Sequence, residues 1–490
     1  MYPSCRPRHR LALLAVGAAA CGNMSGPKAL PCPAAATRRP NVAVYVVPGG
    51  VNSGAGTVTT PWDLQTGLSC ALPGDTVWLR GGRYVGAFAT ALDGTPTTPI
   101  LFRQYPGERA TIDGTLRADG SYLTFWGFEI MQSAPTTYGL QANTNAGHFI
   151  NLIVHDAGTE GISFWTPGEN SELYGCIVYN NGTHDNLDHG VYVHNETGTK
   201  LIADNVFFNN FARGIQVYAS GSNPAIRNVQ VVDNVSFNNG SISTDVGSRQ
   251  NVVINAQVPT SGMVARDNYL YFAPGENGVQ FRFGNVDASS NHDITVDSNY
   301  AVGGAIGLQM RLQWGSATVA GNVLVGDATT QIVSTGGNES GYRWSGNTYY
   351  QDPAAAAWLQ NDVTLSFAGW EAATGLGGSD HTIATRPTTT KVAVLPNRYE
   401  AGRAFVVIYN FGSLAAVDVD LSAVLSAGSK FQIRNVQDPF GTPVDTGTYA
   451  GRVVSIPMGG VQPPLPIGRT TVPPPRTGPS FDVYLVASAP

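Results

Sequence analysis

Charged residues are scarce in this chain of 490 residues. Only 13% of the residues are Asp, Glu, Lys or Arg, and the formal net charge is -6. A protein that binds nucleic acid through phosphate contacts needs a basic surface, so this balance excludes that class. Beyond the N-terminus, no apolar run approaches the ~18 residues that a membrane-spanning helix needs. The sequence therefore predicts no transmembrane helix.

Cysteine is also scarce, with five residues in the whole chain. After Cys21 only Cys32, Cys70 and Cys176 remain, and this odd number excludes a framework built of paired disulfides alone. A single bridge between Cys32 and Cys70 is conceivable. Cys176 is better explained as a small buried residue.

The N-terminus has the pattern of an export signal. Three arginines at positions 6, 8 and 10 precede a short apolar run, LALLAVGAAA, that ends in small residues. We therefore assign residues 1–21 to a signal peptide and expect an exported protein that is secreted, periplasmic or a cell-surface lipoprotein. Cys21 follows three alanines as at a lipoprotein cleavage site, but Ala18 replaces the usual leucine there. Lipid anchoring at Cys21 and plain secretion both stay open.

Glycine is abundant, with 58 residues, and together with Asn, Thr, Ser and Val it favours turn-rich β structure. A repeated unit places Asn or Gly before apolar residues, every 23 to 34 residues, at Gly127, Asn151, Gly175, Asn205, Asn234, Asn268, Asn299, Asn322 and Asn347. Such a period with unequal insertions indicates a solenoid. We expect the six asparagines from Asn205 to Asn347 to stack in single file, about 4.8 Å apart.

A second repeated pattern places a glycine before alternating apolar and polar residues, as in GVYVH from Gly190 and GIQVY from Gly214. Alternation with a period of two marks short strands. Together the two patterns predict an all-β fold, a right-handed parallel β-helix over residues 42–350. A cap helix should precede its first coil, because an open solenoid end exposes the core. An all-β sandwich is the alternative.

The repeat stops after Tyr350. We expect residues 351–385 to form an irregular connector. Residues 386–490 contain hairpin-spaced alternating segments such as AFVVIYNF and FDVYLVA, which predict a small antiparallel β-sandwich on the C-terminal end of the solenoid. The proline-rich stretch VQPPLPIGRTTVPPPRTGPS within it is expected to be an extended loop.

The second pattern sends its polar positions into two columns on one exposed sheet. The first column is predicted to hold Gln141, Ser163, Tyr192, Gln216, Val253, Gln280 and Gln309. The second column is predicted to hold Asn143, Trp165, His194, Tyr218, Asn255, Arg282 and Arg311. Amides bond hydroxyls, aromatic faces stack on pyranose rings, and arginines clamp carboxylates. This strip therefore suits a sugar chain, with the substrate-binding residues Trp165, Gln216, Tyr218, Gln280, Arg282, Gln309 and Arg311. The alternative is a set of amide ladders that only stabilise the sheet.

The stretch NGTHDNLDHGVYVHN, residues 181–195, brings titratable groups to one coil of this strip. Acid and base chemistry on a bound polymer requires such a gathering. The predicted catalytic residues are Asp185, Asp188, His189, Tyr192, His194 and Arg213, with Glu160 one coil earlier. The candidate oxygen ligands for a Ca²⁺ ion are Asp156, Asp185 and Asp188. A zinc site is weaker, because the spacing of the three histidines does not fit one face of a strand. The last alternative is a turn without function.

Several segments resemble bacterial exported right-handed parallel β-helix proteins of the pectate-lyase-like superfold. They are PWDLQTGLSCALPGDTVWLRGGRY, PILFRQYPGERATIDG, LDHGVYVHNETGTKLIADNVFFNNFARGIQVY, NRYEAGRAFVVIYNF and VQDPFGTPV, within residues 42–490. The resemblance implies enzymes or binders of acidic polysaccharides, among them pectate, alginate and dermatan lyases and inverting polygalacturonase-type hydrolases. The polygalacturonase motifs are missing here, since no Asp-Asp pair follows the Asn-Thr-Asn at residues 143–145. The calcium-dependent lyase pattern is also incomplete.

A β-elimination would use the arginines and the His/Tyr pair of the predicted strip. Arg213, Arg282 or Arg311, or a Ca²⁺ ion, would neutralise the uronate carboxylate. His189 or His194 would take the C5 proton, and Tyr192 would protonate the leaving oxygen. An inverting hydrolase would need two carboxylates, from Asp185, Asp188 and Glu160. The sequence favours a lyase acting as a monomer on an acidic polysaccharide; a non-catalytic carbohydrate-binding surface protein is the third possibility.

Overall fold

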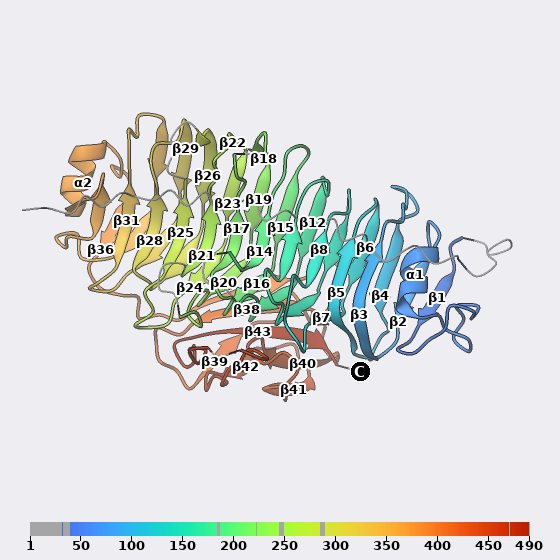
Figure 1. The fold of residues 1–490 in the computed structure, drawn as a ribbon. Helices are drawn as coiled ribbons and strands as arrows, with labels where there is room; N and C mark the ends of the chain where they lie inside the picture. The colour runs from blue at the N-terminus through green and yellow to red at the C-terminus, as the bar shows by residue number, and fades with distance from the viewer. Residues whose placement is uncertain are drawn as a thin grey trace, which may run out of the picture.

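The computed structural model describes residues 32, 40–183, 187–221, 223–244, 249–284, 290–469 and 471–489. The predicted signal peptide and Cys21 lie outside these residues. Figure 1 shows a long solenoid of stacked strands with a smaller β part along one side. The predicted all-β solenoid of parallel strands is confirmed. Among the helices of the described ranges, none is long and apolar enough to cross a membrane.

Most coils of the solenoid contribute three strands, which form two parallel sheets. One sheet, called the first sheet here, has 12 strands: β1 (Ala43–Val46), β2 (Thr76–Leu79), β4 (Ile100–Gln104), β6 (Leu123–Trp126), β9 (His148–Ile150), β12 (Ser171–Tyr174), β15 (Lys200–Ala203), β19 (Val229–Val232), β23 (Met263–Arg266), β26 (Asp293–Asp297), β29 (Ser316–Ala320) and β32 (Tyr342–Ser345).

The other sheet has 22 strands and forms the two remaining faces. Two long strands, β3 (Gly82–Thr90) and β5 (Ala110–Ala118), run through both faces, since β5 pairs with β7 (Glu129–Met131) and with β8 (Leu140–Ala142). The second face continues with β7, β10 (Ile153–His155), β13 (Ile177–Tyr179), β16 (Val206–Phe208), β20 (Val235–Phe237), β24 (Tyr269–Tyr271), β27 (Tyr300–Val302), β30 (Val323–Val325), β33 (Thr348–Tyr350) and β36 (His381–Ile383). The third face continues with β8, β11 (Ile162–Phe164), β14 (His189–Val193), β17 (Arg213–Val217), β21 (Gln250–Ile254), β25 (Val279–Phe283), β28 (Ile306–Met310), β31 (Gln331–Thr335) and β34 (Trp358–Gln360), with β35 (Val363–Leu365) antiparallel to β34. Two short strands, β18 (Ile226–Arg227) and β22 (Thr260–Ser261), pair outside these sheets.

A file of asparagine side chains runs through the corner between the first sheet and the second face. Each Asn donates from Nδ2 to Oδ1 of the Asn in the next coil, at 2.8–3.1 Å, along Asn205, Asn234, Asn268, Asn299, Asn322 and Asn347. All six side chains are buried, and their hydrogen bonds offset the cost of burying amides. The predicted single file is confirmed. Asn151 is offset from this file by one residue. Ile153, Ile177 and Val206 are in register, and Asn151 lies two residues before Ile153, whereas Asn205 lies one residue before Val206.

A second file of amides, not expected from the sequence, lies between the second and third faces. It follows the order Asn181, Asn210, Asn239, Asn251 and Gln280, with Nδ2 to oxygen distances of 2.7–3.0 Å. Its signal in the sequence is the Asn pair that ends three apolar strands, as in IVYNN at residues 177–181.

The register of β25 corrects the predicted position of Gln280. Its side chain is fully buried, and its Nε2 donates to Val302 O and Gly303 O at 2.7 and 3.0 Å. The strand pairs Val253 with Arg282, two residues away from the predicted alignment. Gln280 therefore ends the internal file and is not accessible to a substrate, and Arg282 takes its place in the outer column.

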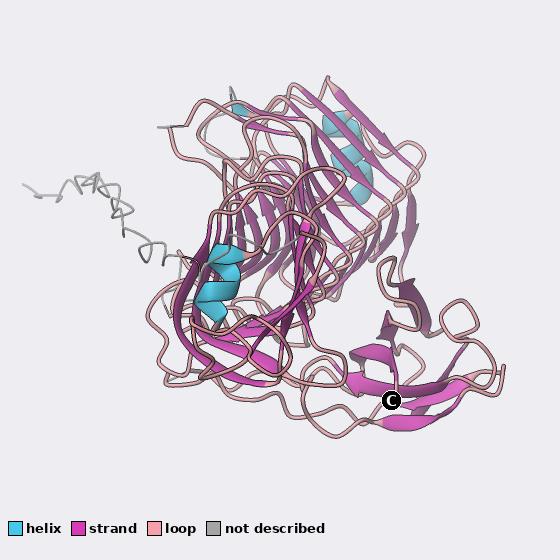
Figure 2. Cartoon of the chain, turned by 90° about the vertical axis from the view of Figure 1, so that its right-hand side faces the viewer, coloured by secondary structure: helices cyan, strands magenta, loops and turns pink. Residues whose placement is uncertain are grey.

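Both ends of the solenoid carry a short helix (Figure 2). Helix α1 (Leu64–Cys70) precedes the first coils, and Asp63 Oδ1 accepts from Thr66 N at 2.7 Å as its N-cap. Cys70 of this helix forms the disulfide with Cys32, whereas Cys176 is free and buried. Helix α2 (Phe367–Thr374) closes the other end with a fully buried Trp370.

The segment 351–385, expected to be an irregular connector, continues the solenoid. Its strands β34 and β36 pair in parallel with β31 and β33 of the preceding coil. The sequence signal was lost here because the Asn-apolar unit is absent from this coil, and Asp380 occupies the corner instead, accepting from Asn347 N at 2.9 Å.

The C-terminal part contains two antiparallel sheets. One has the order β37 (Lys391–Pro396), β38 (Ala404–Tyr409), β43 (Phe481–Ser488), β40 (Lys430–Asn435) and β41 (Asp445–Thr448), and the other pairs β39 (Ala416–Val419) with β42 (Val454–Pro457). This part lies along the second face, not on the C-terminal end as expected (Figure 1). Apolar side chains of β38 and β43, such as Tyr409 and Phe481, pack on Phe237 and Tyr271 of the solenoid. Burial of each large apolar side chain stabilises the contact by about 1.5–3 kcal/mol.

A row of carboxylates follows the first Asn file on its outer side. Asp204, Asp233 and Asp267 each have φ near +55° and occupy the same corner of successive coils. Burial and the neighbouring charge of Asp233 raise the pKa of Asp204 to about 7. Burial and the next carboxylate in the row also raise the pKa of Asp233. The pKa values of these two carboxyl groups are higher in the folded protein than in the unfolded chain. The protonated groups therefore contribute their full stability below pH ~4, and this contribution is lost as the pH rises towards 7.

We therefore expect Asp204→Asn to stabilise the protein at pH 8 and to change little at pH 4. Asn tolerates the positive φ of this corner, as Asn209 and Asn238 do in this chain. One pKa unit corresponds to about 1.4 kcal/mol, and partial exposure screens the effect, so the expected gain is roughly 1–2 kcal/mol. Urea unfolding at both pH values measures it. An equal effect at pH 4 and pH 8 would contradict this explanation.

Candidate functional site

The third face presents a column of outward side chains, one from the middle of each strand. On β14, Val191 and Val193 are buried in the core, whereas Tyr192 is partly exposed. The parallel register continues this column as Ser163, Tyr192, Gln216, Val253, Arg282, Gln309 and Ser334. Apart from Gln280, the register agrees with the first predicted column.

A neighbouring column stands at the position before the strand glycines. His189 is in register with Arg213, and Arg213 with Gln250. Glu160 occupies the same position in the preceding coil, since Gly161 N donates to His189 O at 2.9 Å and so sets the two coils in register. Arg213 Nε donates to Gln250 Oε1 at 2.6 Å, which fixes the guanidinium against the sheet. The sequence pattern had not singled out Gln250, although it precedes the strand residue Asn251 as His189 precedes Gly190.

Aromatic rings connect the two columns around Tyr192. Its ring lies 5.6 Å from His189 and 4.9 Å from Trp165, both edge to face, and it stacks on Tyr218 at 6.3 Å. The charge of Arg213 acts on both His189 and Tyr192. The structure thus brings together His189, Tyr192, Arg213, Trp165 and Tyr218, as the sequence predicted. Gln216 lies buried beside them and donates from Nε2 to Asn255 Oδ1 at 2.8 Å.

The ionisation of this cluster is set by burial. His189 is only 4% exposed, so burial and the charge of Arg213 hold its pKa well below the usual value. Its imidazole is therefore neutral at pH 7, and no hydrogen bond from the described residues reaches the buried Nδ1. Burial raises the pKa of Tyr192, which keeps the phenol protonated. Burial, together with the charge of Arg282, lowers the pKa of Arg213 to about 10, so its guanidinium stays charged.

Carboxylates are few on this face. Glu160 is partly exposed and accepts from Ser163 Oγ at 2.6 Å. Asp188 is 3% exposed, accepts from Thr183 N at 2.7 Å and lies within reach of the charge of Arg469. Of the two described carboxylates that the sequence predicted here, Glu160 of the preceding coil is accessible and Asp188 is not. Asp185, the third predicted one, and His184 lie outside the described residues.

The structure does not place His194 at the accessible face. Its side chain is fully buried, with Nε2 3.3 Å from Ala225 O and Nδ1 3.4 Å from Thr166 Oγ1. The chain after β17 folds back over this position, which strand alternation alone does not reveal. His194 is therefore a buried structural residue, and the predicted catalytic role does not fit it.

Asp156 also departs from its predicted role as a metal ligand. It is buried, accepts from Ile467 N at 2.7 Å, and lies 2.7 Å from His155 Nδ1. The guanidinium of Arg469 approaches it to 3.8 Å, and the charges of Asp156 and Asp188 both act on Arg469. A cation therefore already occupies the space near Asp156, so Asp156 and Asp188 do not fit a Ca²⁺ site. Within the described ranges no group of three or more His, Cys, Asp or Glu is arranged so that it could hold a metal ion.

The predicted substrate-binding arginines follow the cluster along the solenoid. Arg282 is three strands beyond β14 on the third face and in register with Gln309. Burial and the charge of Arg311 lower the pKa of Arg282. Arg213, Arg282 and Arg311 therefore form a positive strip, in which each guanidinium acts on the next.

Comparison with known proteins places the solenoid among right-handed β-helices. Residues 44–252 match a family model described as the Pel9A-like, right handed beta helix region, which confirms the predicted resemblance. The crystal structure of pectate lyase Pel9A is similar, with 16% identity and a TM-score of 0.49 over 63% of this chain and 80% of that chain. A rhamnogalacturonan lyase shows 17% identity and a TM-score of 0.44 over 62% and 87%.

A PL6 family alginate lyase, AlyGC, is 12% identical, with a TM-score of 0.42 over 73% of this chain and 54% of that chain. At these identities the likeness concerns the fold alone. A search of curated proteins gives no match.

Proposed function

We propose that this chain, which carries a Pel9A-like right-handed β-helix region, is a polysaccharide lyase that cleaves a uronate-containing polymer by β-elimination. The observation that carries the proposal is the gathering of a neutral imidazole, a protonated phenol and a charged guanidinium at one coil of the third face. We further propose that the protein acts outside the cytoplasm, as the export-signal pattern of residues 1–21 suggests, and that it acts as a monomer.

The three groups match the three requirements of β-elimination. The guanidinium of Arg213 pairs with the uronate carboxylate and stabilises the negative charge that develops beside C5. His189 takes the C5 proton, the C4–C5 double bond forms, and the C4–O4 bond breaks. Tyr192 gives its proton to the departing O4. His189 then releases a proton to water and Tyr192 regains one, so the site returns to its starting state.

The same geometry disfavours an inverting hydrolase. That mechanism needs two carboxylates roughly 6.5–9.5 Å apart, one on each side of the scissile bond. Glu160 is available, but Asp188 is buried and held by the backbone of Thr183. A lyase needs no such pair.

The positive strip supports an extended acidic substrate. Coils stack about 4.8 Å apart, so Arg282 lies roughly 14 Å from the coil of Tyr192. In this proposal Arg282, Gln309 and Arg311 hold sugars beyond the cleavage point, and Trp165 and Tyr218, whose rings contact Tyr192, offer ring faces beside it. The sheet register that aligns these residues supports their role as subsites.

Incubation of the purified chain with polygalacturonate, alginate and rhamnogalacturonan tests the proposal. A lyase produces unsaturated ends, seen as ultraviolet absorbance, together with an equal number of new reducing ends. Reducing ends without absorbance would show a hydrolase. If neither appears while the chain still co-sediments with one polymer, the third face is a binding surface and the catalytic proposal fails.

A further inference from the structure

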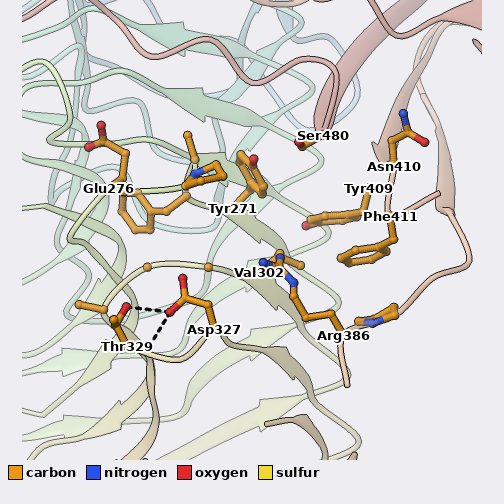
Figure 3. A pocket seen from close by; sticks show the side chains of 18 of the residues that line it. Tyr271, Glu276, Val302, Asp327, Thr329, Arg386, Tyr409, Asn410, Phe411 and Ser480 are labelled. Carbon is orange, nitrogen blue, oxygen red and sulfur yellow. Dashed lines mark hydrogen bonds between the residues drawn. The ribbon is translucent and has the colours of Figure 1, made fainter. Parts of the chain in front are cut away.

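A cavity lies between the second face and the C-terminal sheets, away from the cluster around Tyr192 on the third face. Its volume is about 470 Å³, and its walls come from residues 271–277, 302–305, 327 and 329 of the solenoid and from residues 386–387, 409–411, 413 and 480 beyond it. Figure 3 shows Arg386 between the rings of Tyr409 and Phe411 on one side and Asp327 on the other.

Two opposite charges face this cavity without contacting each other. Arg386 is exposed, and no hydrogen bond or ion pair joins its guanidinium to the described residues. Asp327 uses Oδ1 to accept from Thr329 N at 2.8 Å, Thr329 Oγ1 at 2.7 Å and Thr330 Oγ1 at 3.2 Å. The other carboxylate oxygen of Asp327, Oδ2, accepts no hydrogen bond from the described residues. A donor and an acceptor are therefore both free at one cavity.

A third polar group points to a ligand as well. Tyr271 lines the cavity and is 3% exposed, and its buried hydroxyl has no hydrogen-bond partner among the described residues. An unpaired buried hydroxyl costs about 1–3 kcal/mol, unless water or a ligand satisfies it. Asn410, in contrast, is fully used, since its Nδ2 donates to Leu414 O and Pro479 O.

The aromatic walls of the cavity are held by contacts within the protein. Tyr271 stacks on Phe481 at 4.4 Å, and Tyr409 stacks on Phe411 at 6.3 Å. Tyr409 also donates from its hydroxyl to Leu270 O at 3.1 Å. Phe411 is only partly buried, so one aromatic surface remains available at the cavity. A ligand would meet a preformed site and would not need to order it first.

We propose that this cavity is an accessory saccharide-binding site. Neighbouring hydroxyls of one pyranose ring would bridge Arg386 and Asp327, since a hydroxyl both donates and accepts. The apolar face of the ring would lie on Phe411, and a further hydroxyl would reach Tyr271. The site would hold a saccharide away from the third face, so it does not depend on the proposed cleavage reaction.

The charge pattern separates a saccharide from other ligand classes. A phosphate would meet the carboxylate of Asp327, and a metal ion would meet the guanidinium of Arg386. Glu276 adds no free charge, because it pairs with Arg249 at 3.0 Å. A ligand with many neutral hydroxyls satisfies both signs at once.

The test is calorimetric titration of the full chain with trigalacturonate and with cellotriose, in an Arg213→Ala background that weakens binding on the third face. We expect at least one probe to bind, and Arg386→Ala to weaken that binding about 10- to 100-fold, as loss of a charged hydrogen bond does. Asp327→Asn should weaken it less. Arg452→Ala, an exposed arginine on the same C-terminal part, serves as the matched control and should change nothing.

The two probes distinguish an acidic from a neutral saccharide. Binding of trigalacturonate alone would assign the Arg386 interaction to a carboxylate, and binding of both would assign it to hydroxyls. The proposal fails if neither probe binds at ~10 mM, or if Arg386→Ala binds as tightly as the control. Neither failure would bear on the lyase reaction, which is measured by unsaturated ends on the polymers.

Discussion

His189→Ala is expected to lower kcat by at least about 10²-fold on whichever polymer the chain cleaves, because a positioned base typically contributes 10²- to 10⁴-fold. The imidazole is buried at the edge of the face, 5.6 Å from the ring of Tyr192, and it is neutral at pH 7. Tyr192→Phe should have a loss of similar size, since it removes the proton donor but keeps the ring that packs on Trp165 and Tyr218.

The pH dependence supplies a readout that a structural role would not change. Burial lowers the pKa of His189, so the neutral base persists below its ordinary pKa of about 6.5. The acid limb of kcat/KM should therefore lie below pH 6.5 in the natural protein. His381→Ala is the matched control, because His381 is exposed on the last coil. Near-normal turnover in both His189→Ala and Tyr192→Phe would move the active site elsewhere.

Arg469→Ala is expected to lower the free energy of unfolding by about 3 kcal/mol, because it removes two charge-assisted hydrogen bonds of a buried side chain and a cation that lies beside Asp156. The side chain of Arg469 is 6% exposed, and its Nη1 donates to the backbone oxygens of Asn180 and Gly182. It also covers the ring of Phe211 at 5.2 Å. The substitution would remove a contact that joins the proline-rich loop to the solenoid.

Urea unfolding measures this loss, with Arg476→Ala of the same loop as an exposed control. Asp156→Asn should lower the stability less in the Arg469→Ala chain than in the natural protein, since the interaction with Arg469 is then already lost. A chelator should leave the Tm of the natural protein unchanged, because a guanidinium stands where a Ca²⁺ ion was expected. A chelator-induced fall in Tm, or full stability of Arg469→Ala, would refute this reading of the contact.

The parts that could be predicted are those that repeat from coil to coil. The file from Asn205 to Asn347 was visible because each Asn meets its equivalent in the next coil, so one requirement recurs in the sequence. The outward position of Tyr192 and Arg213 followed from strand alternation. Strand alternation predicted the wrong register for β25. Gly278 resembles the glycine that begins other strands of this face, but Gln280 occupies that position and takes the place of Asn in the internal file.

The parts that could not be predicted depend on contacts distant in the sequence. Arg469 reaches Asp156 from a loop of the C-terminal part, more than 300 residues away along the chain. His194 is covered by a turn whose path alternation does not determine. The side of the solenoid on which the C-terminal sheets lie was likewise not predicted, because the alternating patterns of β38 and β43 do not indicate which face of the solenoid they contact.

The Asn file also has a direction. Between neighbouring asparagines the bond always runs from Nδ2 to Oδ1 of the following coil, so the amide dipoles add and the last coil presents the positive end. There Asp380 receives both the backbone N and Nδ2 of Asn347, and also the hydroxyl of Tyr349. The carboxylate of Asp380 thus neutralises the positive end of the file, as an acidic residue does at the N-terminus of a helix. Coils can thus be added or removed within the file without loss of polarity, but a chain cut before residue 380 would lose the charge that ends it.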